Sequence, residues 1–233
     1  MVTIVLLHGF AATNFTWRDV IKPLAADHEV LALERPFVPL PAALTLTVAD
    51  LDQRGLDRVV LVGHSAGAEL AMHVAASKPH RVVALVLAAP VVGGGPPPFV
   101  RRFAGAPVVR DVGPALLRAG VKLGLRRALA QTWANRDRVT DDVVAGYRAP
   151  LMEPGAAEGL WAMTAHYEEL APDWDALGSM PTLVVKGDRD KWTTLVPLPD
   201  AAVLEYPNCG HLPHEEQPER FVADVLSFVN PLA

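Results

Sequence analysis

The sequence predicts an α/β fold with a mostly parallel sheet of about six strands, flanked by helices. Strand-like apolar runs alternate with helical runs along the chain, which is the pattern of a parallel sheet covered on both faces. Three of the apolar runs lead directly into short loops that carry Ser65, Asp190 and His211. Catalytic groups gather at the carboxyl ends of strands in such sheets, so these loops are expected to carry the functional site.

Six runs are predicted to be strands. In chain order they are residues 2–7, 29–33, 59–62, 82–87, 181–186 and 202–206. A helix-like stretch at 68–77 follows the third run almost directly. From 93 to 178 the sequence is helix-rich with few strand signals, so no strand of the sheet is expected in this segment.

The most specific motif is Gly-His-Ser-Ala-Gly at 63–67, between the third strand and the helix after it. Strand, tight Gly-x-Ser-x-Gly turn and helix form the context of a nucleophile elbow. Gly63 and Gly67 suit this turn because a Cβ at either position would crowd the backbone. The motif predicts that Ser65 is a nucleophile whose hydroxyl stands clear of the sheet edge.

A serine hydroxyl needs a base to take its proton, usually a histidine oriented by a carboxylate. In elbow-type hydrolases the chain order is serine, then acid, then histidine. The loop Gly-Asp-Arg-Asp at 187–190 follows the fifth predicted strand, and Gly-His at 210–211 follows the sixth. We therefore predict Asp190 as the acid and His211 as the base.

Other residues could take these roles. Asp188 is the alternative acid, although an aspartate in a turn commonly bonds its own backbone. His214 is the alternative base, but residues 214–218 look like the solvated approach to the last helix. His8, His64 and His166 would each require a different chain order.

An oxyanion hole needs two backbone N–H groups that point at the developing negative charge. One is expected from Ala66, the residue after the nucleophile. The other is expected from Phe10, in the loop after the first strand.

Taken together, these motifs resemble the α/β-hydrolase superfamily, and specifically its serine-nucleophile, esterase-like branch. The matching pieces are Val-Leu-Leu-His-Gly-Phe at 5–10, Gly-His-Ser-Ala-Gly at 63–67, Gly-Asp-Arg-Asp at 187–190, Gly-His at 210–211 and Pro-Glu-Arg-Phe at 218–221. The resemblance implies a core formed by residues 1–92 and 179–233 and a helical lid formed by 93–178. Related epoxide hydrolases and haloalkane dehalogenases use an aspartate nucleophile, so Ser65 argues against both activities.

The chain also departs from the family's usual pattern. The family often opens with a two-strand hairpin, whereas this sequence leads directly into the strand at 2–7, so the sheet looks minimal. After the second strand the sequence is unusual for the family, which is expected to place Glu34, Arg35 and Phe37 near the mouth of the site.

Composition excludes several function classes. The 233 residues fit one α/β domain with an inserted lid, and the net charge of −5 gives no reason to expect nucleic acid. The single cysteine, Cys209, excludes an internal disulfide. The sequence has neither the Cys and His spacing of a zinc site nor a phosphate-binding loop, so neither a metal nor a cofactor is expected.

The longest apolar run is too short to span a bilayer and no signal peptide is evident, so a cytoplasmic location without stable membrane insertion is expected. Oligomeric state stays open.

The lid is where substrate choice is expected to reside. Residues 96–148 carry ten Lys or Arg against four Asp, and Arg118, Lys122 and Arg126 run along one helix. They form either a solvated face or a docking surface for an anionic partner. The lid aromatics and methionine are expected to form its core or to line an apolar pocket. The predicted substrate-binding residues are Trp133, Trp161, Met163 and Trp192.

The predicted function is hydrolysis of a carboxylic ester, thioester or lactone of a small hydrophobic acyl substrate. An alternative on the same three residues is a carbon–carbon bond hydrolase or a metabolite-tailoring cyclase. A further alternative is a hydrolase-like fold that binds a small molecule without turnover, since fold does not fix function.

Overall fold

The computed structural model describes residues 2–194 and 196–232. Within these ranges six strands lie in the order β2-β1-β3-β4-β5-β6, and every neighbouring pair is parallel. The strands are β1 (Thr3–Leu7), β2 (Glu29–Leu33), β3 (Val59–His64), β4 (Val82–Ala88), β5 (Thr182–Gly187) and β6 (Ala202–Tyr206). The predicted α/β class, with a mostly parallel sheet flanked by helices, is confirmed.

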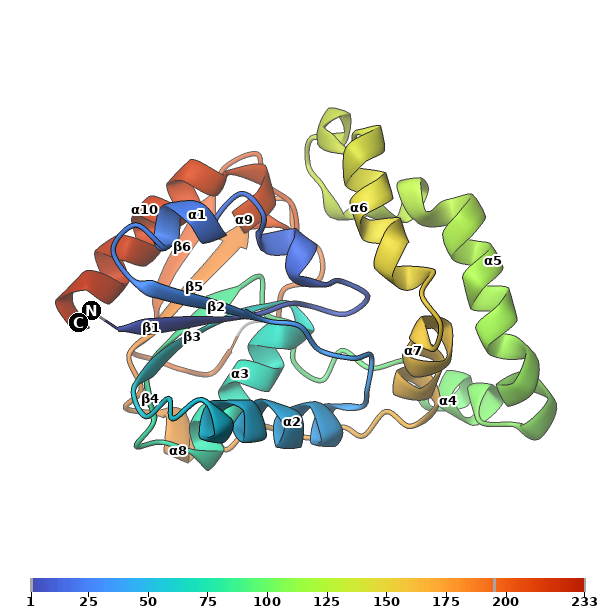
Figure 1. Ribbon diagram of the computed structural model, residues 1–233, viewed down its shortest axis with the longest axis horizontal. Helices are drawn as coiled ribbons and strands as arrows, with labels where there is room; N and C mark the ends of the chain where they lie inside the picture. Colours follow the sequence, from blue (N-terminus) through green and yellow to red (C-terminus); the bar gives the residue numbers. More distant parts are fainter. Residues whose placement is uncertain (1, 195, 233) are drawn as a thin grey trace.

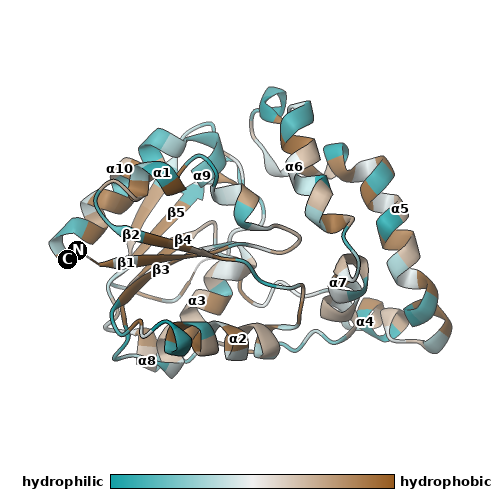
Figure 2. Cartoon of the chain, viewed as in Figure 1, coloured by the Kyte–Doolittle hydropathy of each residue, from teal (hydrophilic) through white to brown (hydrophobic). Residues whose placement is uncertain are grey.

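Helices cover both faces of the sheet (Figure 1). One face carries α1 (Ile21–Leu24) and α10 (Pro218–Val229), and the other carries α2 (Leu40–Gln53), α3 (Ala66–Ser77) and α8 (Trp174–Leu177). Along β1, Ile4 and Leu6 belong to the core under α10, whereas Val5 and Leu7 belong to the core under α3. Parallel strands covered on both faces are apolar almost throughout, and Figure 2 shows this in the brown central strands.

Four helices between β4 and β5 lie together beyond the carboxyl ends of the strands (Figure 1). They are α4 (Pro98–Ala104), α5 (Pro107–Thr132), α6 (Asp141–Leu151) and α7 (Ala156–Ala165), and we call them the helical insertion. Helix α8 falls within the predicted 93–178 segment, but its Trp174 and Leu177 pack into the core under α3. That the insertion acts as a lid stays a prediction.

Two of the basic side chains of α5 contact acidic residues of neighbouring helices. Arg118 donates to both carboxylate oxygens of Glu158 on α7 at 3.2 Å, and Arg126 pairs with Asp141 on α6. Exposed pairs of this kind are screened by water and add little stability. An anionic partner at this helix stays a prediction. Among the described residues, no helix has the length and apolar character needed to cross a membrane.

Candidate active site

Ser65 occupies the turn between β3 and α3 in a conformation that L-residues rarely adopt. Its φ is 53° and its ψ is −122°, and such strain persists only where the surrounding structure enforces it. The close packing of the turn explains its glycines. An added Cβ at Gly63 would lie 2.4 Å from the Gly67 carbonyl oxygen, and one at Gly67 would lie 2.2 Å from the Leu7 carbonyl oxygen. The turn therefore presents Ser65 at the start of α3.

Three side chains from different loops form one hydrogen-bonded chain at this turn. Ser65 Oγ lies 3.0 Å from His211 Nε2, and His211 Nδ1 lies 2.8 Å from Asp190 Oδ2. An ionised carboxylate only accepts hydrogen bonds, so His211 Nδ1 donates to Asp190 and Nε2 is left to accept from Ser65. The structure thus brings together the three residues predicted as nucleophile, base and acid.

Asp190 is held in its ionised form. Burial would raise the pKa of its carboxyl, but the hydrogen bond and the charge interaction with His211, together with two further donors, keep the pKa below its ordinary value. Those donors are Thr193 Oγ1 at 2.5 Å and the Trp192 backbone N–H at 2.9 Å. The ionised carboxylate fixes both the tautomer and the orientation of the His211 ring.

The alternative acid and bases have other contacts. Asp188 accepts a hydrogen bond from the Cys209 backbone N–H at 3.1 Å. Both ring nitrogens of His8 contact the main chain, Nδ1 at the Gly9 carbonyl (3.0 Å) and Nε2 at the Arg35 N–H (3.2 Å). His64 Nε2 donates to the His211 carbonyl at 2.9 Å, while His166 is exposed at the end of α7.

The prediction of a solvated segment at 214–218 is wrong, because every residue of it except Gln217 is buried. His214, Glu215 and Glu216, which form helix α9 (Pro213–Glu216), are only 0%, 1% and 5% exposed. Glu215 accepts from Thr16 Oγ1 (2.7 Å), Arg18 Nη1 (2.5 Å) and the Tyr147 hydroxyl. The local polar composition suggested solvent, but the helical insertion supplies Tyr147 as a partner and helps to cover the segment.

The predicted oxyanion donors both line the cavity at Ser65. Ala66 is the first residue of α3, where a backbone N–H has no partner within the helix. The loop that carries Phe10 lies against the turn, since a Cβ on Gly9 would meet Ser65 Cβ at 3.0 Å. Their service as an oxyanion hole stays a prediction.

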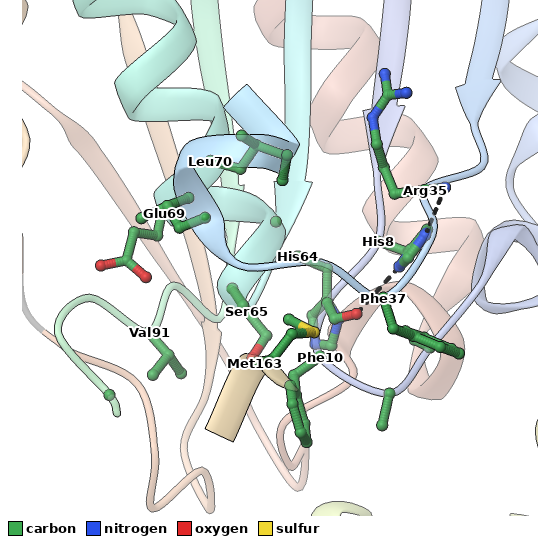
Figure 3. Close-up of a pocket in the computed structure, with 18 of the residues that line it drawn as sticks. His8, Phe10, Arg35, Phe37, His64, Ser65, Glu69, Leu70, Val91 and Met163 are labelled. Carbon is green, nitrogen blue, oxygen red and sulfur yellow. Dashed lines mark hydrogen bonds between the residues drawn. The ribbon is translucent and has the colours of Figure 1, made fainter. Parts of the chain in front are cut away.

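A cavity of about 720 Å³ opens at Ser65, between the sheet and the helical insertion, and its wall is mainly apolar. Met163 and Trp192 line it, as predicted for substrate-binding residues, and Figure 3 shows Met163, Phe10 and Ser65 on its wall. Trp133 and Trp161 do not line it. Trp133 is buried in a separate cluster with Leu129 and Tyr147, and Trp161 donates to the Ala104 carbonyl at 3.1 Å inside the insertion.

The three residues expected near the mouth of the site differ in their placement. Arg35 and Phe37 line the cavity, whereas the exposed Glu34 does not line it and has its Oε1 3.4 Å from His8 Nε2. The Arg35 guanidinium turns away from Ser65 (Figure 3) and bonds to Asp50 (2.5 Å) and Thr47 (3.1 Å). Cys209, which precedes the loop of His211, is fully buried, and burial raises the pKa of its thiol.

Sequence reasoning missed one buried carboxylate of the cavity wall. Glu69 projects from α3 four residues after Ser65, whereas Tyr167, which also lines the cavity, is one of the lid aromatics expected either in the lid core or on the pocket wall. The helical period places residues i and i+4 on the same face, so spacing from the elbow could have identified Glu69.

Comparison with known proteins decides the family. A model of the alpha/beta hydrolase family matches residues 4–225. The chain belongs to this family. It is similar to the uncharacterized hydrolase YugF of Bacillus subtilis (strain 168), at 22% identity over 97% of this chain and 89% of that protein. It is also similar to the lipase LipV of Mycobacterium tuberculosis, at 29% identity over 98% and 93% of the two chains.

Among solved structures, the epoxide hydrolase CorEH without ligand matches with a TM-score of 0.81 and 22% identity, covering 100% of this chain and 93% of that one. This likeness concerns the fold. The predicted superfamily is confirmed, and the family together with its relatives identifies this alpha/beta hydrolase family member as a hydrolase.

Proposed function

We propose that this hydrolase cleaves a carboxylic ester, or a thioester or lactone, of a small hydrophobic molecule through an acyl-enzyme intermediate. The observation that carries the proposal is the hydrogen-bonded chain from Asp190 through His211 to Ser65, at the opening of an apolar cavity. Serine hydrolases use these three groups as orienting carboxylate, general base and nucleophile. A serine in this position suits acyl transfer.

In the first half-reaction Ser65 Oγ attacks the carbonyl carbon while His211 Nε2 takes the hydroxyl proton. The backbone N–H groups of Phe10 and Ala66 stabilise the oxyanion, and His211 then protonates the departing alcohol or thiol. In the second half-reaction His211 deprotonates water, which attacks the acyl carbon and releases the acid and free Ser65. General-base catalysis contributes about 10²–10⁴ in rate, and one oxyanion donor about 10²–10³.

The character of the cavity supports a hydrophobic acyl group as substrate. Ligand sites of small molecules are typically about 300–1,000 Å³ and mostly apolar, with few polar groups. The cavity at Ser65, at about 720 Å³, fits this range. Met163 and Trp192 are the proposed substrate contacts, and the Trp192 ring lies edge-on to His211 with centroids 5.4 Å apart.

The test is a panel of p-nitrophenyl esters, a thioester, a lactone and a vinylogous diketone, assayed with wild type, Ser65→Ala and Ser227→Ala. Ser227 is an exposed serine on α10 and serves as the matched control. We expect ester kcat/KM to fall by about 10⁴–10⁶ in Ser65→Ala and to stay near wild type in Ser227→Ala.

Two results would count against the proposal. Cleavage of the diketone without cleavage of any ester, thioester or lactone would favour carbon–carbon hydrolysis. Ester turnover that survives Ser65→Ala would show that another group is the nucleophile.

A further inference from the structure

The wall of the active-site cavity contains one buried carboxylate that the proposed reaction does not use. Glu69 is only 6% exposed, yet it lines the cavity that opens at Ser65. Its Oε1 accepts a hydrogen bond from the Gly93 backbone N–H at 2.9 Å, while Oε2 has no hydrogen-bond partner among the described residues. Figure 3 shows the side chain extending from α3 toward the segment that carries Val91.

No cation of the described residues forms an ion pair with Glu69, although the cavity has arginines nearby. Arg35, on the cavity wall, is bound to Asp50 and Thr47. Arg101 donates to the Tyr167 carbonyl at 3.1 Å and stacks over the Tyr167 ring. Other polar side chains that line the cavity include Thr164, Tyr167, whose hydroxyl has no hydrogen-bond partner among the described residues, and the exposed Glu168.

A carboxylate in this setting is costly unless a ligand compensates it. Burial raises the pKa of Glu69, and the single backbone hydrogen bond from Gly93 only partly offsets that effect. A buried charge without a partner is unfavourable, and a charge-assisted hydrogen bond from a ligand ammonium would supply the missing partner. The rest of the wall is mainly apolar, so a cation would find its counter-charge at Glu69.

We propose that Glu69 determines specificity, selecting substrates in which a protonated primary amine ends an otherwise apolar chain. This inference rests on the proposed ester hydrolysis, because the distance from the amine to Glu69 is set by the ester carbonyl that Ser65 attacks. Ser65 immediately precedes α3 and Glu69 lies in the first turn of that helix, so the two residues are about one helical turn apart. A linker of five methylenes in the acyl part, or of six in the alcohol part, is long enough for that separation. The amine could belong to the acyl part or to the alcohol part of the ester.

Two pairs of isosteric esters distinguish an amine in the acyl part from an amine in the alcohol part. In the acyl pair, p-nitrophenyl 6-aminohexanoate is compared with p-nitrophenyl heptanoate. In the alcohol pair, 6-aminohexyl acetate is compared with heptyl acetate. For each pair the readout is the ratio of kcat/KM for the amine ester to that for the alkyl ester, so a general change in activity cancels.

We expect this ratio to exceed ten in wild type for one of the two pairs, since a hydrogen bond to a charged group discriminates by roughly 10- to 100-fold. In Glu69→Gln the ratio should fall to one or below, because an ammonium would then enter an apolar cavity unpaired. The glutamine amide keeps an oxygen that can accept the hydrogen bond from the Gly93 N–H, so the position of the segment after β4 should not change. Glu168→Gln, at an exposed carboxylate on the same cavity, should keep the wild-type ratio because water screens that charge.

A ratio of one or less for both pairs in wild type overturns the proposal. So does an amine preference that Glu69→Gln retains or that Glu168→Gln abolishes. The wild-type ratio needs no variant, and Glu69→Met offers a second comparison should the amide variant fail to fold.

Failure of the proposed function is recognised separately. If no ester is turned over, calorimetric binding of hexan-1-amine and 1-hexanol to wild type and Glu69→Gln tests the same preference without chemistry. We expect the amine to bind wild type at least tenfold more tightly than the alcohol, and to lose that advantage in Glu69→Gln. Equal binding of the two ligands to wild type would overturn the role of Glu69.

Discussion

His64, the residue before the proposed nucleophile, holds the main chain of the proposed base. Its Nε2 donates to the His211 carbonyl at 2.9 Å, and its ring lies 5.1 Å from the His211 ring and 4.6 Å from the His214 ring. Burial lowers the pKa of His64 to about 3, helped by repulsion from His211. Burial also lowers the pKa of His214 well below its usual range. Both rings are therefore neutral in the folded protein near neutral pH.

The neutral state of His64 makes stability depend on pH. An unfolded histidine titrates near pH 6.5, so below that pH residue 64 is protonated in the unfolded chain and stays neutral in the folded protein. Lowering the pH therefore favours the unfolded state. From this residue alone, the unfolding free energy decreases by about 2 kcal/mol as the pH is lowered from 7 to 5. In His64→Gln, whose amide can still donate to the carbonyl, we expect the decline to be smaller by that amount.

Urea unfolding of both proteins at pH 7, 6 and 5 measures this difference. His80→Gln is the control, because His80 is exposed and its pH response should match wild type. Parallel pH dependence of wild type and His64→Gln would contradict the neutral assignment.

At the scale of elements, the short helix α9 joins the helical insertion to the loop of His211. Glu216, at its end, accepts hydrogen bonds from the backbone N–H groups of Gly210 (2.7 Å) and Ala134 (2.8 Å). Gly210 precedes the proposed base, and Ala134 follows α5. A single buried carboxylate therefore connects two segments that lie far apart in the sequence.

Removal of this carboxylate leaves both N–H groups without their acceptor. An unsatisfied buried group costs about 1–3 kcal/mol. Because the Gly210 N–H is buried and the Ala134 N–H is only part-buried, we expect Glu216→Ala to lower the unfolding free energy by about 2–4 kcal/mol. Glu219→Ala, at an exposed position three residues later, should change it by about 0.5 kcal/mol or less. Chemical denaturation at neutral pH measures both. Equal effects of the two substitutions would show that the Glu216 contacts do not contribute to stability.

For the whole molecule, the sheet was predictable because its strands are buried on both faces and so appear as continuous apolar runs. Ser65, Asp190 and His211 could be selected because each follows a predicted strand in the order that an elbow hydrolase requires. Their catalytic roles stay predictions, although the structure joins them by hydrogen bonds.

What could not be predicted depends on how the helical insertion packs. An aromatic residue on a helix gives the same local signal whether it faces a cavity or a neighbouring helix. Trp161 packs on Gly113 of α5 and Trp133 joins Leu129 and Tyr147, so neither reaches the cavity. Likewise, Glu216 is buried because Ala134 and Gly210 surround it, and no local pattern around position 216 indicates this contact.

The most direct test of the central claim, an activated serine at position 65, is the intact mass of the protein after incubation with a fluorophosphonate probe. We expect one adduct on wild type and on Ser227→Ala, and none on Ser65→Ala. An adduct that persists on Ser65→Ala, or folded wild type that stays unmodified while a known serine hydrolase in the same tube is fully labelled, would contradict the claim.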